Sequence, residues 1–154
     1  MDQVPRIHFS HVGIFVADLP AMTDFYARVL SLAVTDAGDL GEARLTFLSG
    51  DPAEHHQIVL VSGRPAATGF NTINQISFRL GTLGDLRRLH QRLVDDGRVT
   101  GLAAVTHGIA WSVYGLDPEA NRLEFFVDTP WYIEQPIREP MDLTLTDAEI
   151  LRLT

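Results

Sequence analysis

The amino-acid sequence contains one pattern twice, in two copies 64 residues apart. Residues 9–30 read FSHVGIFVADLPAMTDFYARVL and residues 73–94 read INQISFRLGTLGDLRRLHQRLV. Each copy begins with apolar residues at every second position and continues with apolar residues at every third or fourth position. The first period is typical of a half-buried strand and the second of an amphipathic helix. The repeat therefore predicts two similar modules, each opening with a strand and a helix.

Matched apolar side chains align the two copies. Because alternate strand residues share a face, we expect one apolar row per strand to pack on the following helix. Asp18 and Thr82 stand just before the helical patterns and are expected to be their N-caps. The aligned positions are Val12, Ile14 and Val16 with Ile76, Phe78 and Leu80 in the strands, and Leu19, Met22, Phe25 and Val29 with Leu83, Leu86, Leu89 and Leu93 in the helices.

Short strand-like runs continue each copy and define the predicted fold. We expect an α+β chain of two βαβββ modules, residues 6–62 and 72–130, forming a curved, mostly antiparallel eight-stranded open barrel. The linker 63–71 is rich in Gly, Pro and Thr. The expected later strands lie near residues 33–34, 43–48 and 57–61 in the first module and near 99–106, 110–114 and 123–127 in the second.

The overall composition is that of one globular domain, residues 1–154. Lys and Arg total 12 against 20 Asp and Glu, a net charge of -8, which argues against nucleic acid or an anionic membrane as partner. The sequence has no cysteine, which excludes disulfides and thiolate ligands, and we see no secretory signal. We expect a cytoplasmic protein that forms a dimer or larger homo-oligomer. The tail 131–154 is proline-rich and then acidic, and its TDAEILRL predicts a short capped helix.

Three polar side chains occupy strand faces that point away from the predicted helices. Gln75 in TINQISFRL matches His11 under the 64-residue shift, and both are expected to face the same cavity. Glu124 in NRLEFFVDTP lies on the corresponding face of the last strand, and a carboxylate there needs an ionic partner or a cation. Arg79 or Arg122 could form a salt bridge with it. Alternatively, His11, Gln75 and Glu124 bind one divalent first-row metal.

The paired modules, with HVGIFVADLPAMTDFYARVL at the start and GLDPEANRLEFF at the end, resemble the vicinal oxygen chelate superfamily. That superfamily includes glyoxalase I, bleomycin- and fosfomycin-resistance proteins, methylmalonyl-CoA epimerase and type I extradiol dioxygenases. The resemblance covers residues 8–130 and implies the fold given above. HHQIVL and THGIAWSVY are, in addition, similar to the catalytic domain of the extradiol dioxygenases.

The extradiol resemblance implies roles for individual residues. It places a catalytic histidine at His56, a second histidine near His107 and a tyrosine at Tyr114. The implied cofactor is a divalent metal, Fe(II) by preference, with Mn, Zn, Ni or Co as alternatives. His11 and Glu124 match two of the family's three iron ligands.

The sequence departs from the extradiol pattern at Gln75, where a second histidine is expected. An amide oxygen still coordinates in glyoxalase I and the epimerase, although it is a weaker donor than imidazole. Three functions remain open. The first is a ring-cleavage dioxygenase acting on a small catechol. The second is a glyoxalase- or epimerase-like enzyme without O2, which would want an acid where the first module has Ile58. The third is a resistance-type protein that binds a small molecule.

Overall fold

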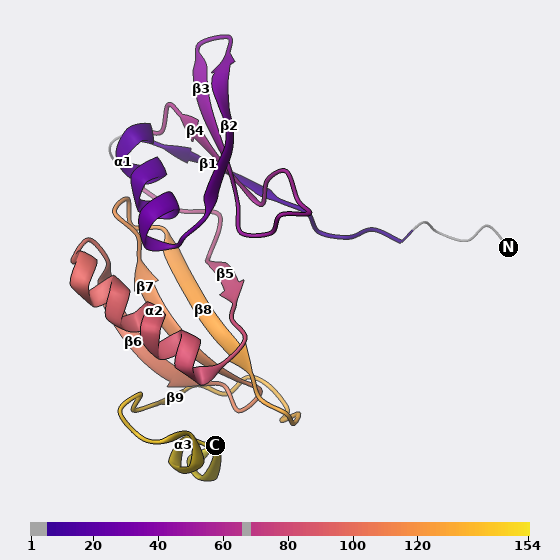
Figure 1. Cartoon of the computed structure of the whole chain (residues 1–154), viewed down its shortest axis with the longest axis vertical. Helices are drawn as coiled ribbons and strands as arrows, with labels where there is room; N and C mark the ends of the chain where they lie inside the picture. Colours follow the sequence, from indigo (N-terminus) through magenta and orange to yellow (C-terminus); the bar gives the residue numbers. More distant parts are fainter. Residues whose placement is uncertain (1–5, 66–68) are drawn as a thin grey trace, which may run out of the picture. The chain divides into compact units, whose positions relative to one another are not determined.

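The computed structural model describes residues 6–65 and 69–154, and the chain consists of two compact units, Met1–Thr68 and Gly69–Thr154. Each unit has its own β-sheet and its own helices (Figure 1). Among the residues that the structure describes, no helix is both long and apolar enough to cross a membrane.

The first unit is a four-stranded sheet in the order β1-β4-β3-β2. Strand β1 runs parallel to β4, and the other two pairings are antiparallel. A helical segment lies between the first two strands, so the unit is βαβββ. Its elements are β1 (Val12–Val16), α1 (Leu19–Asp24), the π-helical turn η1 (Phe25–Val29), β2 (Ala33–Leu40), β3 (Ala43–Ser49) and β4 (Ile58–Ser62).

The second unit repeats this arrangement and adds the tail. Its sheet has the order β5-β8-β7-β6-β9, with β5 parallel to β8 and the remaining pairs antiparallel. Helix α2 connects the first two strands of the unit, as in Figure 1. The elements are β5 (Ile76–Arg79), α2 (Leu83–Asp96), β6 (Thr100–Thr106), β7 (Ala110–Leu116), β8 (Arg122–Asp128), β9 (Glu139–Pro140) and α3 (Asp147–Leu153).

The predicted fold class is confirmed, and the local signals act as expected. The Asp18 carboxylate accepts a hydrogen bond from Ala21 N at 3.0 Å, and the Thr82 hydroxyl accepts one from Asp85 N at 3.1 Å. Both side chains therefore cap their helices. In the tail, Thr146 caps the predicted short helix, which is α3.

The apolar rows named in the sequence form the two cores. In the first unit Val16, Met22 and Phe25 are fully buried, and in the second Leu86 and Leu93 are. Strand β8 contributes Leu123, Phe125 and Val127 to the second core, all at most 6% exposed. One sheet face in each unit is thus used for packing, which leaves the opposite face for other roles.

Two strands differ from the prediction. Strand β2 extends to Leu40, well beyond the expected Ala33–Val34, because it pairs along its whole length with β3 while all eight of its residues stay exposed. An exposed strand carries no apolar alternation to reveal it. Strand β9 was not predicted at all. It has two residues, Glu139 and Pro140, and exists because it pairs with the edge of β6.

Gly115 offers a test of packing in the second unit. A Cβ at this buried position would lie 2.6 Å from Val99 Cγ1 and 3.1 Å from Leu102 Cδ2, whereas a Cβ at Gly38 in β2 would meet no atom within 4 Å. We expect Gly115→Ala to lower the free energy of unfolding by about 1–3 kcal/mol because the new methyl group overpacks the core. Gly38→Ala is the control and should be neutral or slightly stabilising. Equal effects of the two substitutions in urea denaturation would contradict this packing.

Candidate metal and catalytic site

The centre of the candidate site in the second unit is the carboxylate of Glu124, on β8. It is only 8% exposed, and four neutral groups donate hydrogen bonds to it. One carboxylate oxygen, Oε2, accepts from Gln75 Nε2 at 2.8 Å and Ser77 Oγ at 2.6 Å. The other, Oε1, accepts from Ser112 Oγ at 2.9 Å and Tyr114 OH at 2.7 Å. The carboxylate is therefore held from both neighbouring strands.

Strand register explains this convergence. Strand β8 lies between β5 and β7, where Ser77 pairs with Glu124 on one side and Tyr114 pairs with it on the other. Ser112 is two residues from Tyr114 and so shares its face of β7. Gln75 precedes β5 and shares its face with Ser77. The site is a cross-strand cluster that follows directly from the pairing.

An arginine salt bridge does not account for the burial of Glu124. Arg79 instead pairs with Asp128, at 3.1 Å from Nε to Oδ2, and its guanidinium lies 5.3 Å from the ring centre of Phe126. The four hydrogen-bond donors to Glu124 carry no positive charge, and the imidazole of His107 lies further away, with Nε2 3.8 Å from Oε1. A buried carboxylate in such a setting is a favourable ligand for a cation.

Gln75 and Glu124 are neighbours, and each carries an oxygen of the kind that binds divalent cations. In this structure the Gln75 amide nitrogen donates to Glu124 and, at 3.0 Å, to Ser77 Oγ. Only the carbonyl oxygen of Gln75 could therefore act as its ligand atom beside the carboxylate. Within residues 6–65 and 69–154, no cluster of three or more His, Cys, Asp or Glu side chains that could hold a metal is found. The third expected ligand, His11, belongs to the first unit.

His107 and Tyr114 extend the network from Glu124. His107 follows β6, its Nε2 lies 3.0 Å from the Tyr114 hydroxyl, and its Nδ1 lies 2.6 Å from the carbonyl oxygen of Ile137. A carbonyl only accepts, so Nδ1 carries a hydrogen. The Tyr114 hydroxyl therefore lies between the Glu124 carboxylate, to which it donates, and His107 Nε2.

The Tyr114 hydroxyl remains a hydrogen-bond donor over the whole neutral range. Burial, followed by the hydrogen bond and the charge of Glu124, raises the pKa of Tyr114 to about 12. Gln75 and Arg138 act in the opposite direction and only reduce the rise. The Arg138 guanidinium lies 5.2 Å from the centre of the Tyr114 ring.

Three histidines gather in the first unit, at the ends of β1 and β4. Because these strands are parallel, the residues before them are adjacent: Val12 N donates to Gln57 O at 3.0 Å, and the rings of His11 and His56 are 4.2 Å apart. His55 also contacts His56, with 2.9 Å between the two Nδ1 atoms. Alternation along a strand would place His55 on the other face from His56.

The surroundings of His56 favour its neutral form. Burial is the largest cause that lowers its pKa below 6.5, followed by the neighbouring imidazoles of His11 and His55. Glu54 opposes this shift. A neutral imidazole is able to accept a proton from a bound substrate.

The structure therefore groups the six candidate residues into two sets. His11 and His56 are together in the first unit, and Gln75, Glu124, Tyr114 and His107 are together in the second. Sequence reasoning missed Ser77 and Ser112 as partners of Glu124. The spacing could have indicated them, because each serine is two residues from a candidate residue and so shares its strand face. Serines are, however, common on strand faces for other reasons.

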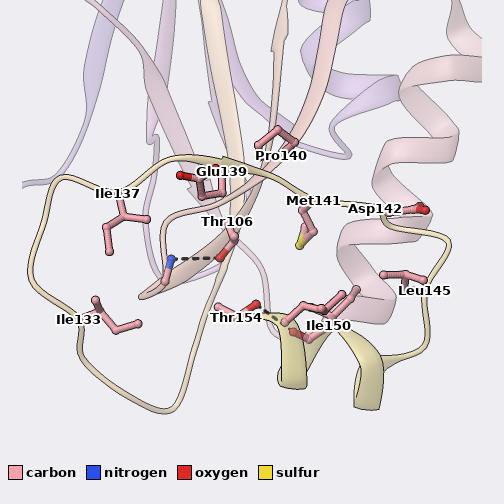
Figure 2. A pocket seen from close by; sticks show the side chains of 12 residues that line it. Thr106, Ile133, Ile137, Glu139, Pro140, Met141, Asp142, Leu145, Ile150 and Thr154 are labelled. Carbon is pink, nitrogen blue, oxygen red and sulfur yellow. Dashed lines mark hydrogen bonds between the residues drawn. The ribbon is translucent and has the colours of Figure 1, made fainter.

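A separate cavity of about 340 Å³ lies in the second unit, lined by the end of β6, by tail residues between Ile133 and Leu145 and by helix α3 (Figure 2). Its lining is mainly aliphatic and includes Ile133, Ile137 and Ile150. The hydroxyls of Thr106 and Thr154 also line it, but both are engaged, with Gly108 N and with Trp111 Nε1. None of the six candidate residues lines this cavity, so it is not the site described above.

Comparisons with known proteins identify the family. The sequence model of the Glyoxalase/Bleomycin resistance protein/Dioxygenase superfamily matches residues 8–125, and the chain belongs to this superfamily. Two curated relatives come from Rhodococcus globerulus. Biphenyl-2,3-diol 1,2-dioxygenase 2 is 29% identical over 78% of this chain and 62% of the relative, and biphenyl-2,3-diol 1,2-dioxygenase 3 is 32% identical over 83% and 66%. The chain thus spans less than two thirds of the length of either relative.

Solved structures agree on the fold. A glyoxylase/bleomycin resistance protein/dioxygenase domain from Frankia sp. EAN1pec superposes with a TM-score of 0.69 at 20% identity, covering 82% of this chain and 100% of that one. The fosfomycin resistance protein FosX from Listeria monocytogenes, in complex with Mn(II) and sulfate, gives a TM-score of 0.60 at 16% identity, covering 80% and 93%. Many members of this superfamily are metalloenzymes.

The contribution of the two serines to the site is testable by stability measurements. Ser112 is fully buried, so Ser112→Ala should lower the free energy of unfolding by about 1–3 kcal/mol, because Glu124 loses a donor that water cannot replace. Ser77→Ala removes a donor to the same carboxylate from an exposed position, where water can take its place, and should cost less than about 1 kcal/mol. Equal costs in urea denaturation would show that burial of the network does not determine its energy.

Proposed function

We propose that this chain is a metal-dependent, extradiol-type ring-cleavage dioxygenase acting on a small catechol-like substrate. The observation that carries the proposal is the hydrogen-bonded chain from Glu124 through Tyr114 to His107, with Gln75 on the other carboxylate oxygen. It joins two proposed metal ligands to two proposed catalytic residues. The similarity to two biphenyl-2,3-diol dioxygenases supports the same reaction class.

The proposed metal ligands are His11, Gln75 and Glu124, and Fe(II) is the proposed metal. When bound, the metal would supply Lewis-acid and redox chemistry to the substrate and O2. Three protein ligands leave positions open for both. The proposal requires the first unit to present His11 to the same ion as the two oxygen donors of the second unit.

The remaining residues have proton-transfer and hydrogen-bonding roles in this proposal. His56 would accept the proton of a catechol hydroxyl, for which its lowered pKa is suitable. Tyr114, with a pKa of about 12, would stay protonated, and once Glu124 binds the metal its hydroxyl would donate to a substrate oxygen instead of to the carboxylate. His107, whose Nε2 lies 3.0 Å from that hydroxyl, would hold it in position.

The second candidate is a non-oxidative metal enzyme of the same superfamily. The specific observation in its favour is Gln75, because an amide replaces the second histidine implied by the extradiol resemblance. Against it, Ile58, which is only 2% exposed, stands in the first unit where a proton-abstracting acid would be expected.

The ligand set is tested by metal affinity. His11→Ala and Glu124→Ala should each abolish tight binding of Fe(II) or Zn(II), because each leaves only two protein ligands. Gln75→His should tighten binding, since imidazole is the better donor for these ions. Competition titration with a chromophoric chelator measures all three, with His90→Ala on helix α2 as control. Wild-type affinity in Gln75→His would show that Gln75 does not coordinate.

The reaction is tested by oxygen uptake. The Fe(II) protein should consume O2 with a catechol and form a yellow ring-opened product. His56→Ala should lower kcat by roughly 10²–10⁴-fold with unchanged metal content, because it removes the proposed base. Gln75→His should raise turnover by restoring a second imidazole. If the iron protein binds catechols without consuming O2, and Gln75→His is equally inert, the dioxygenase proposal is wrong and the non-oxidative candidate takes its place.

A further inference from the structure

The tail of the chain holds His107 from several directions. After β8, residues 129–140 pass alongside the turn that joins β6 to β7, where His107 and Gly108 lie. Thr129 Oγ1 and Trp131 Nε1 donate to the Gly108 carbonyl at 2.9 and 2.8 Å. Beyond them, β9 pairs with the end of β6, Glu139 opposite Thr106. The turn that presents His107 is thus fixed by the tail.

Gln135 has the central position in this arrangement. Its side-chain Nε2 donates to the His107 carbonyl oxygen at 2.7 Å, and its Oε1 accepts from Ile137 N at 3.1 Å. The carbonyl of Ile137 in turn accepts from His107 Nδ1 at 2.6 Å. The three contacts form a closed cycle. It runs from the main chain of His107 to the Gln135 amide, then to the main chain of Ile137, and back to the imidazole of His107.

We propose that Gln135 is a positioning residue that fixes the tautomer and the direction of the His107 imidazole. With Ile137 held by Gln135, its carbonyl keeps the hydrogen of His107 on Nδ1. Nε2 then faces the Tyr114 hydroxyl, 3.0 Å away. The hydrogen bonds of Gln135 go to the main chain of Ile133, Ile137 and His107, so its effect on Tyr114 and Glu124 passes through His107.

The side-chain type fits this role. The bridge needs a donor for the His107 carbonyl and an acceptor for Ile137 N within one planar group, and an amide supplies both. A carboxylate would keep the acceptor but lose the donor, and a thioether would lose both. These differences provide two graded variants, Gln135→Glu and Gln135→Met, which leave the side-chain length nearly unchanged.

The tautomer is measured without any substrate. In long-range ¹H–¹⁵N correlation spectra of the full chain, recorded with Zn²⁺ at mildly alkaline pH, we expect His107 to carry its hydrogen on Nδ1. His107→Asn assigns the signal. Gln135→Met should shift His107 toward the Nε2-protonated form, and Gln135→Glu should shift it less. Gln91→Met, which removes an amide paired with Asp95 on α2, should leave it unchanged.

The kinetic consequence rests on the proposed function. If His107 assists the reaction, Gln135→Met should lower kcat by about 10- to 100-fold with KM little changed, because the ring is misdirected while the substrate contacts remain. The spectra decide the structural proposal independently of turnover. A His107 that is Nε2-protonated in the wild type, or unchanged in both Gln135 variants, overturns it. A shifted tautomer with no dioxygenase activity in any form supports the role of Gln135 and contradicts only the proposed reaction.

Discussion

A buried carboxylate with neutral partners is the constraint on which the candidate site depends. Glu124 is almost enclosed by the sheet, and an ionised group in that position is costly unless its oxygens are satisfied. Four hydrogen bonds meet that requirement, from an amide and three hydroxyls. None of these four donors carries a positive charge. The site therefore holds a carboxylate at a fixed place and orientation, which favours the binding of a cation.

Parallel pairing of the first and last strands explains where these groups come from. In each unit the first strand lies beside the fourth, β1 beside β4 and β5 beside β8. Polar residues at or just before these strands are therefore neighbours although about 45 to 49 residues separate them in sequence. As a result, His11 contacts His56 in the first unit, and Gln75 contacts Glu124 in the second. Duplication of one topology has thus produced two different polar clusters at corresponding places.

The sequence predicted those features that depend on apolar period and on capping. Local residue types predicted apolar strand rows and helix N-caps, and the structure confirms both. Examples are the row Leu123, Phe125 and Val127 and the N-caps Asp18 and Thr82. The same periods place Gln75 and Glu124 on the face that does not pack on a helix. Period alone, however, does not distinguish a serine that donates to a buried carboxylate from one that faces water. Ser112 was missed for that reason.

Contacts made by main-chain atoms cannot be predicted from residue types. The partner of His107 Nδ1 is the carbonyl of Ile137, which any residue could supply, and β9 exists only because the tail reaches the edge of β6. Such features depend on the path of the chain after β8. They could be found only once that path was known.

Residues of the tail, which lie beyond the part that matches the superfamily model, contact two residues of the candidate site. The match ends at residue 125, whereas Gln135, Ile137 and Arg138 contact His107 and Tyr114 from beyond it. The guanidinium of Arg138 favours the phenolate and Glu124 favours the phenol, and the second effect is the larger, so Tyr114 remains a donor. Substitutions in the tail would therefore alter the donor strength of Tyr114 and the direction of His107 while leaving the carboxylate and its strand register intact.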